Sequence, residues 1–157
     1  MKNHPVTPLV KETFLAAVKN SVRTNTFRHL YAKVGSKKLD IAENGRLSCA
    51  FFVSSILTIF GLITSVHATV DGTIKDLGKS GWKRTKKPVI GSVIIWGLEK
   101  SKEGDIHRHI GFYIGNGKVV SNNSALGRPA IHDWAFGSRN GIPKRKIEAI
   151  FRHQKLS

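Results

Sequence analysis

The apolar positions follow helical spacing in the first half of the chain and form short strand-like runs in the second half. Phe14 and Val18 belong to a set near helical spacing that predicts a first helix close to the N-terminus. A second helical piece is predicted over 25–33, and the polar, glycine-containing stretch 35–47 is predicted to be a loop. A further helix is expected over 69–79, where Thr is followed by acidic residues.

The uncharged run over 47–70 has two interpretations. About 20 apolar residues suffice to cross a bilayer, so the run could be a membrane span. It could also contain a helix that is buried on all sides in the centre of a domain. Interrupting Ser and Thr residues, and Gly61 as a natural helix end, favour the second interpretation. We therefore expect a buried helix from Ser48, a candidate N-cap, to about Phe60.

Strands are predicted in the second half of the chain. Their expected ranges are 89–96, 108–114, 118–122 and 147–152. The second and third flank Gly115-Asn116-Gly117, the strongest short hairpin signal in the chain. Helices followed by antiparallel strands indicate an α+β fold. No long linker divides the chain, so we expect a single domain over 1–157, with an N-terminal extension over 1–46 and a core over 47–157.

Composition adds a strong charge. The 157 residues carry 26 Lys and Arg against 10 Asp and Glu, a net charge of +16, which indicates an anionic partner. The basic residues are spread out and lack an aromatic ladder, so a polyanion is favoured over base-specific nucleic-acid binding. No signal peptide is visible. Metal-ligand spacing and phosphate-binding loops are also missing, and we expect no metal or cofactor.

Cys49 is the only thiol, and it falls at the predicted start of the most apolar helix. A helix N-terminus favours the thiolate, because its N–H groups and its dipole stabilise negative charge. A catalytic cysteine also needs an imidazole to take its proton. His109 opens a predicted strand next to the hairpin and is the preferred candidate, with His107 as its competitor.

The imidazole then needs a third, orienting residue. A two-residue hairpin turn places Asn122 on the face of His109, and a three-residue turn places Ser121 and Asn123 there instead. Asn122 is our first choice, with Ser121 and Asn123 in reserve. Candidate substrate-binding residues are Trp96, His132 and Trp134.

Three segments together resemble the NlpC-type and CHAP-type cysteine peptidases. The segments are Cys49-Ala-Phe-Phe-Val-Ser, Gly91-Ser-Val-Ile-Ile-Trp96 and His109-Ile-Gly-Phe-Tyr-Ile-Gly-Asn-Gly-Lys118. The resemblance implies a papain-like fold with Cys49 as nucleophile and His109 as base, and a hydrolase of peptidoglycan stem peptides or cross-bridges that acts at the cell wall. This chain has Ser48 where the family usually has Asp, and Ser121 near the position where the family often has a histidine.

The alternative is a non-catalytic basic module that binds an anionic wall polymer or nucleic acid. In that interpretation Cys49 is only a packing residue of the core.

Overall fold

The computed structural model of the protein describes residues 4–157, which form an α+β fold with three α-helices and a mainly antiparallel sheet. The helices are α1 (Val10–Asn20), α2 (Cys49–Ile59) and α3 (Val70–Lys79), and the 3₁₀ turn η1 (Gln154–Leu156) follows the last strand. The strands are β1 (Tyr31–Val34), β2 (Lys37–Asp40), β3 (Lys83–Arg84), β4 (Val93–Lys100), β5 (Ile106–Gly115), β6 (Lys118–Asn123), β7 (Arg128–Asp133), β8 (Ser138–Arg139), β9 (Ile142–Pro143) and β10 (Ile147–Arg152).

Six strands pair antiparallel in the order β3-β10-β4-β5-β6-β7. The strands predicted over 108–114, 118–122 and 147–152 are confirmed as β5, β6 and β10. The strand predicted over 89–96 begins only at Val93, because Gly91 has a positive φ of 93°, outside the extended region. Strand β7 was not predicted: it contains Pro129, which is compatible only with an edge strand, and β7 lies at the edge of the sheet.

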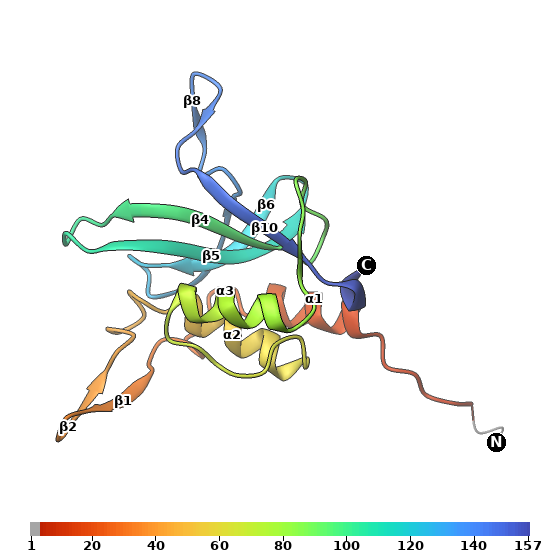
Figure 1. Ribbon diagram of the computed structural model, residues 1–157, viewed down its shortest axis with the longest axis horizontal. Coiled ribbons are helices and arrows are strands. Elements are labelled where there is room, and N and C mark those ends of the chain that lie inside the picture. The colour runs from red at the N-terminus through yellow and green to blue at the C-terminus, as the bar shows by residue number, and fades with distance from the viewer. Residues whose placement is uncertain (1–3) are drawn as a thin grey trace.

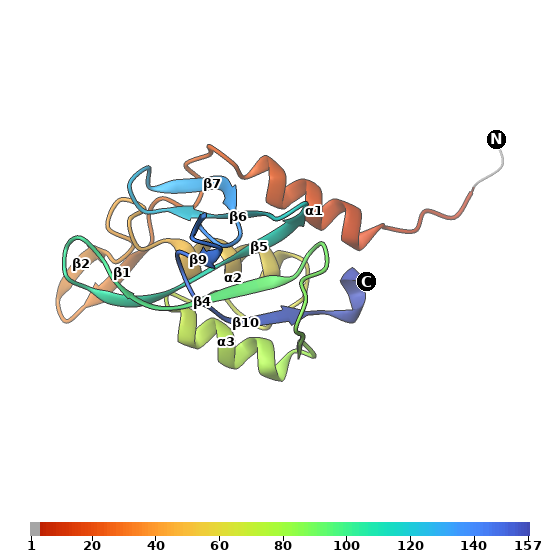
Figure 2. The same ribbon diagram turned by 90° about the horizontal axis from the view of Figure 1, so that it is seen from above.

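The three helices cover one face of this sheet (Figures 1 and 2). Phe14 of α1 and Phe52 of α2 both contact Phe112 of β5, with ring centroids 5.3 and 5.6 Å from it. All three side chains are fully buried, and each such burial contributes roughly 1.5–3 kcal/mol. Helix α2 packs against β5 and β6 and also contacts both α1 and α3, which explains why it is apolar on nearly all sides.

The uncharged run is therefore a buried helix followed by a loop. Helix α2 ends at Ile59, and Gly61, with φ of 60°, lets the chain leave the helix. Within residues 4–157, no helix combines the length and the apolar character that crossing a membrane requires. The helix predicted over 69–79 is confirmed as α3, and Thr69 caps it by accepting a hydrogen bond from the Gly72 N–H.

The predictions for 25–47 were wrong over 25–40, whereas 41–47 is a run of turns, as expected for a loop. Instead of a helix over 25–33 and the first part of the loop expected over 35–47, the chain makes turns and then the hairpin β1–β2, which projects from the rest of the protein (Figure 1). Gly35, with φ of 60°, lies in the tight turn of this hairpin. Most of its side chains are exposed, so the hydrophobic alternation that identifies a strand is weak here.

The other face of the sheet carries a smaller apolar cluster. It is built on Ile94, Trp96 and Val119, with Trp134 and Phe136 packed against it. The Trp96 indole N–H donates to the backbone carbonyl of Trp134 at 2.8 Å. This cluster lies against β5 on the side that carries the His109 ring, since Trp96 is the cross-strand partner of His109.

Candidate active site

Cys49 is the first residue of α2, as predicted, and it is buried. The first N–H groups of a helix have no partner within the helix. The expected N-cap at Ser48 does not form: its side chain makes no capping bond, and its buried hydroxyl has no hydrogen-bond partner. The first-turn N–H groups of α2 are therefore not capped by this side chain and point toward the thiol's end of the helix.

Burial dominates the electrostatics of the thiol. It raises the pKa of Cys49 to about 11, because a thiolate loses hydration in an apolar site. Four smaller influences lower this pKa: the backbone N–H of Ala50, the positive charge of Arg145, and the backbone N–H groups of Ile110 and of Cys49 itself. The helix N-terminus thus stabilises the thiolate as expected, but less than burial destabilises it, so the resting group is a neutral thiol.

His109 lies on β5 and is buried. Burial, followed by the charges of Arg145, His132 and His107, holds the pKa of its imidazole well below the usual value of 6.5. The ring is consequently neutral at neutral pH, which is the state that can accept a proton.

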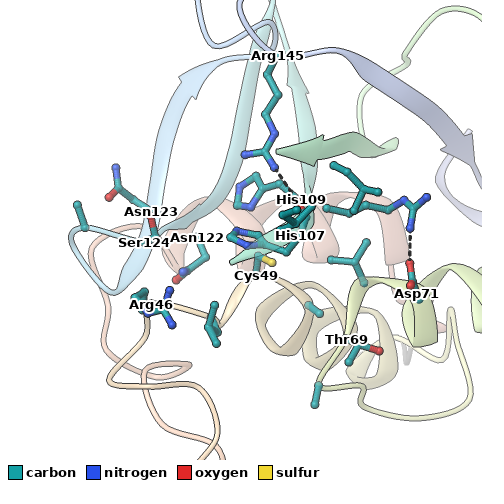
Figure 3. Close-up of a pocket in the computed structure, with 18 of the residues that line it drawn as sticks. Arg46, Cys49, Thr69, Asp71, His107, His109, Asn122, Asn123, Ser124 and Arg145 are labelled. Atoms are coloured by element: carbon teal, nitrogen blue, oxygen red, sulfur yellow. Dashed lines mark hydrogen bonds and ion pairs between the residues drawn. The ribbon is translucent and has the colours of Figure 1, made fainter. Parts of the chain in front are cut away.

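Cys49 and His109 line the same cavity, which has a volume of about 530 Å³ (Figure 3). The thiol lies next to the backbone of Ile110, the residue that follows His109 in β5. Within residues 4–157 the thiol and the imidazole do not hydrogen-bond to each other in the resting structure. Catalytic hydrogen bonds are often long before substrate binds, so a direct bond in the resting structure is not required for proton transfer.

The hydrogen-bond partner of the His109 ring is Ser121, not Asn122. The distance from His109 Nε2 to Ser121 Oγ is 2.8 Å. The two central residues of the turn are Asn116 and Gly117, and both have positive φ. Strand β5, however, contains one extra residue between Tyr113 and Gly115, the residue that pairs with Lys118.

This bulge shifts the β5–β6 register by one residue and so reverses which side chains share a face. Gly111 consequently pairs with Ser121, and Ser121 lies on the face of His109. Gly111 is needed at this point, because a Cβ there would be 2.7 Å from the Ser121 Cβ.

Asn122 has a different place in the site. Its amide N–H donates to the backbone carbonyl of Gly45 at 2.7 Å, which ties the loop before α2 to β6. Its Oδ1 is buried without a hydrogen-bond partner, and the residue lines the cavity beside Cys49. Asn123, the other reserve, also lines the cavity and accepts a hydrogen bond from the Leu126 N–H.

The three predicted substrate-binding residues do not line this cavity. Trp96 is fully buried under the rings of His109 and Phe136. Trp134 packs edge-on against Tyr113. His132 is hydrogen-bonded inside the protein instead: its Nε2 lies 2.6 Å from Ser121 Oγ, and its Nδ1 lies 2.8 Å from the backbone carbonyl of Asp133.

Arg145 is a site residue that the sequence analysis did not find. It belongs to the basic stretch Lys144-Arg145-Lys146, which resembles a solvated surface segment, yet its side chain reaches the cavity (Figure 3). Its guanidinium donates to the carbonyls of His107 at 3.2 Å and Gly97 at 3.4 Å and forms an ion pair with Glu99 at 3.1 Å. A fixed positive charge next to the thiol and the imidazole favours the thiolate and the neutral ring.

Metal binding has no structural support in the described part of the chain. Among residues 4–157, no group of three or more His, Cys, Asp and Glu side chains is arranged to hold a metal ion.

Comparisons with known proteins identify the fold. No protein family matches the sequence, and no curated protein matches it. Among solved structures, NlpC2 from Trichomonas vaginalis is similar over 95% of this chain and 48% of its own chain, with a TM-score of 0.52 and 16% sequence identity. The chain thus spans about half the length of that protein. The α+β fold is NlpC-like.

Proposed function

We propose that the protein is a cysteine hydrolase that cleaves an amide bond, with Cys49 as nucleophile and His109 as general base. One observation carries this proposal: the only thiol of the chain, at the N-terminus of a buried helix, shares a cavity with a neutral, buried imidazole. We propose the papain-like arrangement, in which the nucleophile helix packs against a sheet that bears the histidine. We propose further that residues 1–157 form a single domain.

The reaction begins with the neutral pair. His109 accepts the thiol proton through its Nδ1, and the sulfur attacks the carbonyl carbon of the substrate amide. The proposed donor to the oxyanion is the Cys49 backbone N–H at the start of α2. The imidazolium returns the proton to the leaving amine, and water then hydrolyses the thioester with His109 again as base.

The cavity has features that suit a peptide. Asn122 Oδ1 and His107 Nδ1 are buried polar atoms without hydrogen-bond partners in the described residues, and both residues line the cavity. A buried polar atom without a partner costs about 1–3 kcal/mol. Both atoms are shielded in the resting structure, so a peptide N–H reaches the Asn122 oxygen only after the lining side chains move.

The substrate that we propose is a peptidoglycan stem peptide or cross-bridge. The NlpC-like fold and the sequence motifs around Cys49 and His109 support this choice. The net charge of +16 supports attraction to anionic polymers of the cell wall, which is where we propose that the protein acts.

The test is the release of soluble fragments from purified cell walls. We expect release by the wild type, loss to background with Cys49→Ala, and unchanged release with Ser36→Ala, a control in the exposed β1–β2 turn. Equal thermal melting of the variants establishes that folding is intact. Undiminished cleavage by Cys49→Ala would overturn the proposal.

The same experiment distinguishes the hydrolase from the alternative function, a basic binding module. Among residues 4–157 none of the ion pairs involves a lysine, so the lysine charges remain available to a polyanion, which favours a basic binding module as second candidate. Such a module would bind walls or nucleic acid in sedimentation assays equally well with Cys49 or Ala at this position, and would release nothing.

A further inference from the structure

Ser121 connects two histidines that are far apart in the sequence. Its hydroxyl oxygen lies 2.8 Å from His109 Nε2 and 2.6 Å from His132 Nε2, and His132 Nδ1 lies 2.8 Å from the Asp133 carbonyl. His132 is on β7 and reaches Ser121 because Ser121 pairs with Ala130, two residues before it. These three side chains, His109, Ser121 and His132, are called the relay below.

The direction of every hydrogen bond in the relay follows from its last member. A backbone carbonyl only accepts, so His132 Nδ1 must donate to Asp133. Burial lowers the pKa of His132, so the ring is neutral at neutral pH and its single proton is the one on Nδ1. His132 Nε2 is then an acceptor, and the single proton of the Ser121 hydroxyl must point toward it.

The same reasoning fixes the proton on His109. Ser121, whose hydroxyl proton is directed to His132, can only accept from His109, so His109 Nε2 carries the proton of the neutral ring. Its Nδ1 is left with a lone pair, and among residues 4–157 this nitrogen has no hydrogen-bond partner. The base is therefore set in the tautomer that accepts a proton at the nitrogen not bonded to Ser121.

We propose that His132 is a positioning residue, which fixes the tautomer and the orientation of His109 through Ser121. This rests on the proposed function only in naming Nδ1 as the atom that takes the Cys49 proton. When His109 gains that proton, its Nε2–H bond to Ser121 becomes charge-assisted and stronger, and the Ser121 bond to His132 is polarised with it. The relay contains no carboxylate, so it orients the base without greatly raising its pKa.

Two substitutions of His132 separate this role from packing. His132→Phe keeps a ring but removes the acceptor, so the Ser121 hydroxyl turns to His109 Nε2 and drives the proton to Nδ1. His132→Gln can place a carbonyl oxygen near the former Nε2 position and keeps the tautomer. Long-range ¹H–¹⁵N NMR of the ring reports the protonated nitrogen directly, without substrate.

We expect His109 to be protonated at Nε2 in the wild type and in His132→Gln, and at Nδ1 in His132→Phe. Amide hydrolysis by His132→Phe should lose roughly 10²–10⁴-fold in kcat with little change in KM, the size of an acid–base contribution. A wild-type ring protonated at Nδ1, or a tautomer that His132→Phe leaves unchanged, overturns the relay. Because the NMR result is independent of activity, a protein without hydrolase activity would overturn the proposed function and leave the relay intact.

Discussion

The protein holds two histidine-containing hydrogen-bond clusters, each around a buried polar group, and they are built in opposite ways. In the Asp76 cluster, the carboxylate of α3 accepts hydrogen bonds from the backbone and side chain of Thr64, from the Ser65 N–H and from the Ser80 hydroxyl, and pairs with His67 Nε2 at 2.7 Å. In the relay, His109 has only a neutral hydroxyl as partner and faces a cavity with a thiol.

This contrast distinguishes a hydrogen-bond cluster that serves stability from one that is available for chemistry. The carboxylate of Asp76 has used its acceptor capacity on neighbouring donors, and these bonds hold the pKa of Asp76 well below its usual range despite burial. The cluster fastens the 60–69 loop to α3. The relay, in contrast, leaves one nitrogen of His109 without a hydrogen-bond partner in the described residues, and His109 lines the same cavity as Cys49. A histidine with an unused nitrogen in a cavity that also holds a thiol is available for proton transfer, whereas one paired with a saturated carboxylate serves stability.

The most direct test of this comparison replaces one histidine of each cluster by alanine. We expect His109→Ala to lose about 10²–10⁴-fold in cell-wall hydrolysis, because it removes the general base, and to keep most of its stability. We expect His67→Ala to behave oppositely, with hydrolysis within a few-fold of wild type and a lower melting temperature. Hydrolysis rates and thermal unfolding of both variants provide the measurement. Equal loss of activity in the two variants would show that the clusters do not differ in role.

Asp76→Asn tests the structural cluster itself. Replacing the buried carboxylate by an amide removes one acceptor oxygen and places an N–H group against several donors. Leaving a buried donor without its acceptor costs about 1–3 kcal/mol. We expect a loss of that size in the free energy of unfolding, measured by urea denaturation. The matched control is Glu12→Gln, an exposed acid of α1, with an expected change within about 0.5 kcal/mol. A change as small as that of the control would show that the cluster does not stabilise the fold.

The sequence was sufficient to predict the parts of the site that depend on strong local patterns. The uncharged run predicted helix α2 with Cys49 at its first position, and Gly115-Asn116-Gly117 predicted the β5–β6 hairpin. Both signals are local, because they depend on apolar periodicity and on residues that accept positive φ.

The partner of His109 could not be deduced in this way. One extra residue in β5 exchanges Ser121 for Asn122 on the relevant face, and nothing in the pattern of apolar residues reveals a bulge of one residue. The far end of the relay was also hidden, since β7 has a proline and few apolar residues and reads as a loop. Arg145 was missed because an arginine that reaches into the protein has the same local sequence as a fully exposed one. Tertiary contacts determine all three.

The Asp76 cluster and the Cys49 thiol also differ in the pH range over which their contributions to stability change. The folded-state pKa of Asp76 is lowered, so its stabilising contribution is present above the unfolded carboxyl pKa of about 3.9 and is lost as the pH falls below it. The pKa of Cys49 is instead raised from 9.0 to about 11, so folding favours the neutral thiol. Its contribution to stability is present below pH 9 and is lost as the pH rises from 9 toward 11.

This shift has a direct consequence for reactivity, because only the thiolate is alkylated. We expect the rate of Cys49 modification by iodoacetamide to rise about tenfold per pH unit from pH 7 and to level off only near the raised pKa of about 11. Mass spectrometry measures the single adduct, and Cys49→Ser provides the baseline, since the chain has no other thiol. A rate that has already reached its plateau at pH 7 would show a preformed thiolate paired with protonated His109. In that case burial would not control the thiol, and the neutral-pair mechanism would have to be replaced by one that starts from the ion pair.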